Sequence, residues 1–136
     1  MVEDEPGLTR VVQRILERRG YRVYTAANGV EALQVLAEHL GGVDLVFTDL
    51  AMPKLGGAAL YQRVRTELGP MRFLFASGYS ALEAQWKQGL PADLPFVSKP
   101  WTLAELLGGV RAALDAPVPA FSMVAAPSGA TKSRVA

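Results

Sequence analysis

The stretch DLVFTDLAMPKLGG, residues 44–57, places a carboxylate directly after a short apolar run and then bends the chain with a proline and two glycines. Residues 45–47 form a continuous apolar run of the kind found in strands that are buried on both faces. Residues 73–75 form a second run of this kind, and residues 96–97 form a shorter one. The three runs predict the inner strands of a parallel sheet.

Helical patterns lie between these runs, and a β-branched and aromatic stretch at residues 21–26 predicts a further strand. Asn28 with Glu31 and Thr102 with Glu105 have the spacing of helix N-caps and their third-position partners. Helices are expected over residues 6–19, 28–40, 59–68, 82–88 and 102–114. Strands that alternate with short crossover helices predict an α/β, doubly wound parallel sheet.

The composition limits the chain to one domain and excludes several classes of protein. Its 136 residues are 50% hydrophobic, and 14 Lys and Arg against 13 Asp and Glu leave a net charge of +1. This balance gives no sign of binding to nucleic acid or to an acidic membrane surface. The chain has no cysteine, no apolar run long enough to cross a bilayer and an acidic start, MVEDEPG. We expect a cytoplasmic protein with one folded domain at residues 1–116 and a flexible tail at 117–136, where Pro, Ala, Ser and Gly dominate.

Polar residues follow each predicted strand at the end where ligands bind in sheets of this type. Glu3 and Asp4 follow Val2, and Asp49, Ser77 and Lys99 each end or follow an apolar run. Three carboxylates and one ammonium group at one edge carry a charge near −2, which requires a compensating cation. A site of carboxylate oxygens suits Mg²⁺ or Mn²⁺.

This constellation predicts phosphoryl chemistry, although each residue alone has an ordinary explanation. Asp49 is placed to attack phosphorus and form an acyl phosphate, with the metal held by Glu3 and Asp4. Lys99 and the Ser77 hydroxyl would bind phosphoryl oxygens. A single Asp after a strand is usually a cap or a turn residue, and a Lys before Pro is usually a surface turn. The agreement of four strand ends favours the functional interpretation.

Four segments of the chain resemble, in order and spacing, the signature segments of the receiver domain of two-component response regulators. They are VEDEP (2–6), DLVFTDLAMPKLGG (44–57), FLFASGYS (73–80) and FVSKPWT (96–102). The resemblance implies a flavodoxin-like fold with strand order 2-1-3-4-5 and a cis bond between Lys99 and Pro100. The site roles that it implies are Asp49 as phosphoacceptor, Mg²⁺ on Glu3, Asp4, Asp49 and the Ala51 backbone carbonyl, Lys99 on the phosphoryl group, and Ser77 and Phe96 as switch residues.

The resemblance also implies partners and shows one departure. A histidine kinase or phosphotransfer protein would donate the phosphoryl group, and SGY at 77–79 is similar to receivers associated with hybrid histidine kinases. No direct contact with nucleic acid and no membrane insertion are implied. The partner face is expected near Trp86, Phe96, Trp101 and Leu103. Only Met1 and Val2 precede Glu3, so the first strand is expected to be truncated and its neighbours to lack backbone partners.

Two alternatives remain beside the phosphorylation switch. A pseudo-receiver would bind a partner independently of phosphorylation, and a truncated first strand that spoils the metal site would favour it. An aspartyl phosphatase would need a second Asp two residues after Asp49, where this chain has Ala51. The expected protein is therefore a phosphoacceptor switch and not an enzyme, with at most slow self-dephosphorylation.

Overall fold

The computed structural model describes residues 1–50, 52, 54–77, 90–91, 94–116 and 134–135. Helices and strands alternate along most of these ranges, as the hydrophobic pattern predicts. The elements are α1 (Pro6–Arg18), β1 (Arg22–Val23), α2 (Gly29–Glu38), β2 (Val46–Asp49), α3 (Gly57–Glu67), β3 (Phe73–Ser77), β4 (Phe96–Ser98), α5 (Leu103–Asp115) and β5 (Arg134–Val135). The helix predicted at 82–88 lies outside the described residues.

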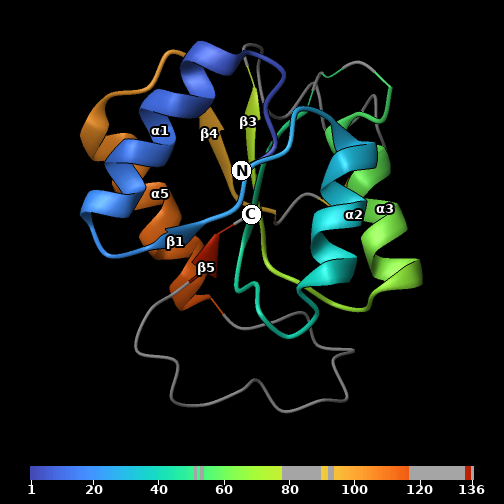
Figure 1. Cartoon of the computed structure of the whole chain (residues 1–136). Helices are drawn as coiled ribbons and strands as arrows, with labels where there is room; N and C mark the ends of the chain where they lie inside the picture. The colour runs from blue at the N-terminus through green and yellow to red at the C-terminus, as the bar shows by residue number, and fades with distance from the viewer. Residues whose placement is uncertain (51, 53, 78–89, 92–93, 117–133, 136) are drawn as a thin grey trace.

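The strands form a layer between two pairs of helices, with α1 and α5 on one face and α2 and α3 on the other (Figure 1). Strands β2, β3 and β4 are parallel neighbours in that order, with Val46 opposite Phe73 and Phe75 opposite Phe96. Parallel strands need crossover connections, and α3 supplies the one between β2 and β3. This arrangement confirms the predicted flavodoxin-like α/β fold.

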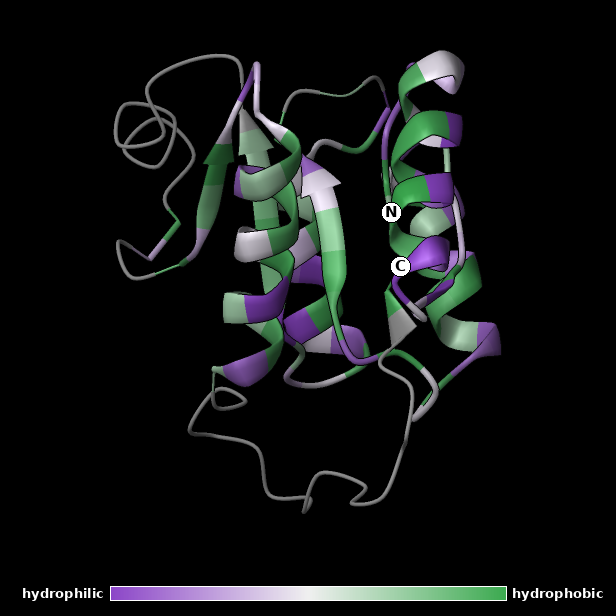
Figure 2. Cartoon of the chain, turned by 90° about the vertical axis from the view of Figure 1, so that its left-hand side faces the viewer, coloured by the Kyte–Doolittle hydropathy of each residue, from purple (hydrophilic) through white to green (hydrophobic). Residues whose placement is uncertain are grey.

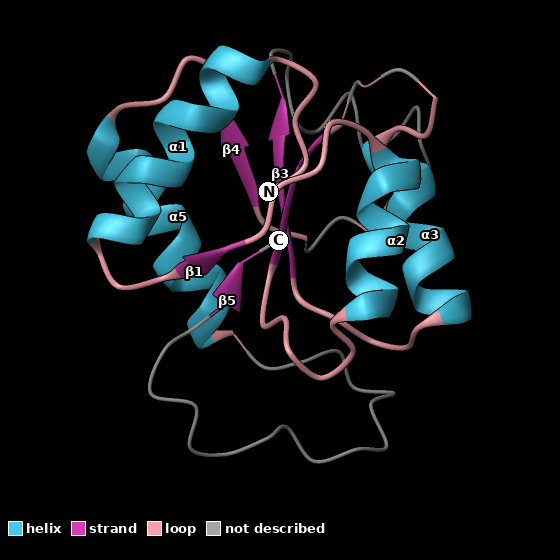
Figure 3. Ribbon diagram, viewed as in Figure 1, coloured by secondary structure: helices cyan, strands magenta, loops and turns pink. Residues whose placement is uncertain are grey.

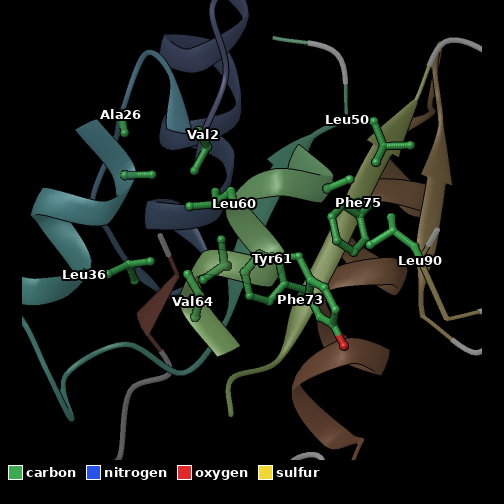
Figure 4. Packing of buried hydrophobic residues seen from close by; sticks show 13 residues of the cluster. Val2, Ala26, Leu36, Leu50, Leu60, Tyr61, Val64, Phe73, Phe75 and Leu90 are labelled. Carbon is green, nitrogen blue, oxygen red and sulfur yellow. The ribbon is translucent and has the colours of Figure 1, made fainter. Parts of the chain in front are cut away.

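Two hydrophobic clusters fill the space between the sheet and its helices. The cluster beneath α2 and α3 includes Phe73, Phe75 and Leu60 (Figure 4), and the cluster beneath α1 and α5 includes Leu74 and Leu106. Successive strand residues point to opposite faces, so a continuous apolar run serves both clusters. Hydrophobic residues accordingly dominate the strands, while hydrophilic residues appear on the helices (Figure 2). No helix in the described ranges combines the length and apolar character that a bilayer span requires.

The predicted helix caps are present. The Asn28 side chain accepts a hydrogen bond from the Glu31 N–H (3.0 Å), and the Thr102 hydroxyl oxygen accepts one from the Glu105 N–H (3.1 Å). Each cap satisfies a donor that the first helical turn leaves without a partner. Pro6 stands in the first turn of α1, where a missing N–H does no harm.

The central position of the sheet, between β1 and β2, is shared by the two ends of the chain (Figure 3). Val2 forms parallel bridges with Ala26 beyond β1 and with Thr48 in β2. β5 pairs in parallel with β1, and its Val135 also forms a bridge with Leu45. The spatial order is therefore β1, the position shared by Met1–Val2 and β5, then β2, β3 and β4. If the shared position is numbered as strand 1 of the fold and β1 as strand 2, this is the predicted order 2-1-3-4-5.

The structure differs from the sequence-based expectation at Arg134 and Val135, which fall within the predicted flexible tail but form β5. Val135 is fully buried, and its carbonyl oxygen accepts a hydrogen bond from the Tyr24 N–H (3.0 Å). A buried backbone donor needs a partner, and a β-branched apolar residue suits the interior of a sheet. The predicted truncation of the first strand therefore leaves fewer unpaired groups than expected. Residues 117–133 and 136 lie outside the described residues, and the tail there stays a prediction.

Candidate functional site

Asp49 is the last residue of β2, a strand in which every residue is buried. Its N–H donates to the Val2 carbonyl oxygen (3.1 Å), and it lies opposite Ala76 of β3. Ladder contacts on both sides fix the backbone from which the carboxylate projects. The side chain itself is 11% exposed. A rigid strand thus presents this carboxylate at the edge of the sheet.

The chain turns sharply after Asp49 and returns past it at the start of α3. Lys54 has a φ of 65°, and Gly57 lies so close that a Cβ there would overlap the Asp49 carbonyl oxygen. Glycine therefore lets the first turn of α3 pack against the backbone that carries the carboxylate. Pro53, which the sequence places in this bend, lies outside the described residues.

Replacing Gly57 by alanine is expected to destabilise the fold by about 1–3 kcal/mol, because backbone atoms of residues 49 and 50 must move to make room. The midpoint of urea unfolding measures this effect. The matched control is Gly108→Ala in α5, where an added Cβ meets nothing within 4 Å and should stabilise the helix by about 0.5–1 kcal/mol. Equal stability of the two variants would contradict the close approach.

Lys99 joins the two carboxylates that are furthest apart in the sequence. Its Nζ donates to Asp49 Oδ2 (2.9 Å) and to Glu3 Oε2 (3.4 Å). Lys99 follows β4, and the Lys99–Pro100 peptide bond is cis, as the family resemblance implies. Nζ also lies 5.9 Å from the centre of the Trp101 ring, which is within the range of a cation–π contact.

Asp4 completes an acidic group with Glu3 and Asp49. One carboxylate oxygen from each residue lies within 4.8 Å of the others. Glu3 and Asp49 are 4% and 9% exposed, whereas Asp4 is open to solvent. Such a set of hard oxygen donors with an open side fits a divalent cation that keeps some of its water, as Mg²⁺ does.

The electrostatics of the site show an excess of negative charge. Burial, and then the neighbouring Asp49 carboxylate, raise the pKa of Glu3 to about 7, against the lowering effect of Lys99. Burial alone would lower the pKa of Lys99, but its hydrogen bond and charge contact with Asp49 raise it on balance. One ammonium group therefore does not fully compensate the buried carboxylates, and a further cation would be stabilised here.

The raised pKa of Glu3 predicts how the stability of the chain depends on pH when no divalent ion is present. A carboxyl group that binds its proton more tightly in the folded state than in the unfolded state adds to the free energy of unfolding. For Glu3 this contribution is fully present below the unfolded pKa of 4.5 and is lost as the pH rises through the folded pKa of about 7. Unfolding free energy, measured in a chelator across this interval, should fall more steeply for the native chain than for Glu3→Gln. The control Glu38→Gln, on the exposed side of α2, should leave the profile unchanged. A profile that Glu3→Gln does not alter would contradict the assignment.

The structure brings together Glu3, Asp4, Asp49 and Lys99, which the sequence placed at one edge. Ser77 ends β3 opposite Ser98, in the strand that lies beside Asp49, but its side chain is not described. Ala51 and Trp86 lie outside the described residues.

Phe96 and Trp101, which the sequence assigns to the switch and the partner face, are partly buried. Phe96 stacks on Phe75 with 5.4 Å between ring centres, and Trp101 packs against Phe47 at 5.8 Å. Leu103 is 52% exposed. The contact of Trp101 with Lys99 was not predicted from the sequence, although their positions two residues apart signal proximity.

Comparison with known proteins gives a consistent result. The family model described as "Response regulator receiver domain" matches residues 1–111. The chain is 38% identical over 117 residues to the sensor kinase CckA of Brucella abortus. This match covers 85% of the present chain but only 12% of the length of the kinase. It is 31% identical to the response regulator receiver protein CpdR of the same organism, over 85% of this chain and 95% of that protein.

The fold of the chain is also similar to that of a solved receiver domain. The receiver domain of the hybrid histidine kinase CckA superimposes with a TM-score of 0.69 at 34% identity, and the match covers 83% of this chain and 94% of that domain.

Proposed function

This chain belongs to the response regulator receiver domain family, and we propose that Asp49 is the residue on which it accepts a phosphoryl group. Receiver domains are the phosphoacceptor switches of two-component signalling, so the class of function follows from the family. The assignment of residues is specific to this chain. It rests above all on Lys99 Nζ, which binds the Asp49 and Glu3 carboxylates together although 50 and 96 positions separate it from them.

The reaction that we propose is a transfer from a phosphohistidine of a kinase or phosphotransfer protein. A carboxylate oxygen of Asp49 forms a bond to phosphorus, the phosphorus–nitrogen bond breaks, and the imidazole leaves with its electron pair and takes up a proton. Lys99 donates hydrogen bonds to the negative oxygens that gather around Asp49. Asp49 is fixed by strand contacts and so is oriented before the donor arrives.

Mg²⁺ is the cofactor that we assign to Glu3, Asp4 and Asp49, with the Ala51 carbonyl as a further ligand from the family pattern. The close set of carboxylate oxygens and the unbalanced charge reported by the Glu3 pKa both support it. When bound, Mg²⁺ neutralises charge on the phosphoryl oxygens. Because Glu3 must be ionised to act as a ligand, Mg²⁺ affinity is expected to rise with pH through about 7.

The output of the switch is proposed to pass through Ser77 and Phe96. A phosphoryl group on Asp49 would favour a position of the Ser77 hydroxyl and of the Phe96 ring that differs from the unphosphorylated one. The partner face would then be read near Phe96, Trp101 and the exposed Leu103, with Trp86 added from the sequence. A kinase or phosphotransfer protein is the proposed partner, in the cytoplasm. We propose no catalytic turnover beyond slow self-dephosphorylation.

The test of this function is the intact mass of the chain after incubation with Mg²⁺ and acetyl phosphate. We expect one added phosphoryl group, and none when a chelator replaces Mg²⁺. A folded chain that stays unmodified under both conditions would contradict the proposal and leave the phosphorylation-independent interaction module as the better description.

A further inference from the structure

Two pieces of chain from opposite ends of the sequence share the central position of the sheet. One is the N-terminal pair Met1 and Val2, and the other is β5, Arg134–Val135. Both run parallel to the strands on either side. Figure 1 shows β5 beside β1, close to the point marked as the N-terminus.

The hydrogen bonds of Tyr24 join the two pieces. The Tyr24 N–H donates to the Val135 carbonyl oxygen (3.0 Å), and the Tyr24 carbonyl oxygen accepts from the Met1 nitrogen (2.7 Å). In a parallel ladder, one residue bonds through its N–H and its C=O to two residues of a single neighbouring strand that lie two positions apart. The two hydrogen bonds of Tyr24, to Val135 and from Met1, therefore have the pattern that a single neighbouring strand would give.

The register on the β1 side agrees with this pattern. Val135 pairs with Val23, and Val2 pairs with Ala26, which is three residues further along (26 − 23 = 3). Three steps also lead from Val135 to Val2 if two strand positions are counted between them. The two pieces thus keep the register of an uninterrupted strand.

The β2 side gives the same spacing independently. Val135 forms a bridge with Leu45 and Val2 forms one with Thr48, again three residues apart (48 − 45 = 3). The faces alternate as well. Val135 and Met1 belong to the cluster beneath α1 and α5, and Val2 belongs to the cluster on the other face. An uninterrupted strand would distribute its side chains in this way.

We propose that the central strand of the sheet is built from two separate segments, Met1–Glu3 and β5. β5 docks in the gap between β1 and Leu45, which we call the slot, and completes the sheet in line with the N-terminal segment. The slot accepts an extended segment that offers backbone groups on both edges and a β-branched apolar side chain beneath α1 and α5. The occupant is the C-terminal segment of the same chain. This inference concerns the fold and does not depend on phosphorylation.

The N-terminal piece that carries Glu3 also lies in line with β5, which is more than 130 positions away in the sequence. The Glu3 N–H donates to the Ala26 carbonyl oxygen (3.0 Å), and the Val2 N–H donates to the Phe47 carbonyl oxygen (2.7 Å). These bonds hold only the short N-terminal piece. With β5 absent, β1 and Leu45 would lose a partner for buried backbone groups.

Two altered chains test the proposal. The first ends at Ser133, and the second has residues 134–136 removed from the C-terminus and placed directly before Met1. We expect the shortened chain to unfold at a lower urea concentration and to exchange the Tyr24 amide hydrogen at least about tenfold faster. The rearranged chain should regain both properties. Unchanged stability and exchange in the shortened chain, or failure of the rearranged chain to recover them, would overturn the proposal.

Point variants and concentration distinguish the donor of the strand. Val135→Asp should act like the shortening, whereas Val11→Asp, at an exposed position of α1, should not. The unfolding midpoint of the full chain should be independent of protein concentration. A midpoint that rises with concentration would place the docked strand on a second copy and contradict the assignment to the same chain.

Discussion

The chain with Asp49→Asn is expected to take up no phosphoryl group from acetyl phosphate and Mg²⁺, whereas the native chain takes up one. An amide nitrogen and carbonyl oxygen cannot supply the anionic oxygen that attacks phosphorus. The variant should lose phosphoryl uptake although it stays folded. Removing the Asp49 charge takes away one of the causes that raise the pKa of Glu3 and leaves Lys99 with Glu3 as its partner. Intact mass measures the uptake, and urea unfolding at pH 8 checks that the fold is retained.

Asp115→Asn is the matched control for this variant. Asp115 carries the same functional group at an exposed position at the end of α5, where it pairs with Arg111. Its replacement should leave phosphoryl uptake at the native level and change stability by no more than about 0.5 kcal/mol. Uptake by Asp49→Asn equal to that of the control would contradict the assignment of the phosphoacceptor.

Lys99→Met is expected to have the second largest effect and to act on both stability and reactivity. Without the ammonium group, two buried carboxylates face one another with no compensating charge, so the metal-free chain should lose about 2–4 kcal/mol at pH 8. The loss should shrink near pH 5, because Glu3 is then protonated. The rate of phosphoryl uptake should fall by about 10²–10³ through the loss of a donor to the developing charge.

Lys54→Met controls for the removal of a lysine, since Lys54 is exposed and lies on the loop after β2. It should leave stability and uptake close to native values. Saturating Mg²⁺ should restore part of the stability that Lys99→Met loses, because the metal supplies positive charge at the same carboxylates. A loss that is the same at pH 5 and pH 8, and that Mg²⁺ does not reduce, would show that Lys99 acts through packing and not through charge.

Most of the site could be predicted from the sequence because parallel strands end at one edge. Asp49 ends one buried apolar run and Lys99 follows another, so a parallel sheet brings them together without any knowledge of side-chain geometry. The contact that joins both to Glu3 confirms this reasoning. Which carboxylate has the raised pKa could not be predicted, because it depends on how deeply each is buried.

The completion of the central strand could not be predicted from the sequence. A strand of two residues has no measurable periodicity, and the composition around it is typical of a flexible segment. Val135 forms a strand because β1 on one side and Leu45 on the other offer it backbone partners. Tertiary context decided this element, whereas local pattern decided the helices that Asn28 and Thr102 cap.

Asp49, held beside Lys99 and Glu3, is the residue that we propose receives the phosphoryl group. Reduction of the phosphorylated chain with borohydride converts an acyl phosphate into the corresponding alcohol, and mass spectrometric sequencing of its peptides locates the changed residue. We expect homoserine at position 49 and native side chains at Glu3 and Asp4. A reduced residue at any other position, or a phosphorylated chain that borohydride leaves unchanged, would contradict it.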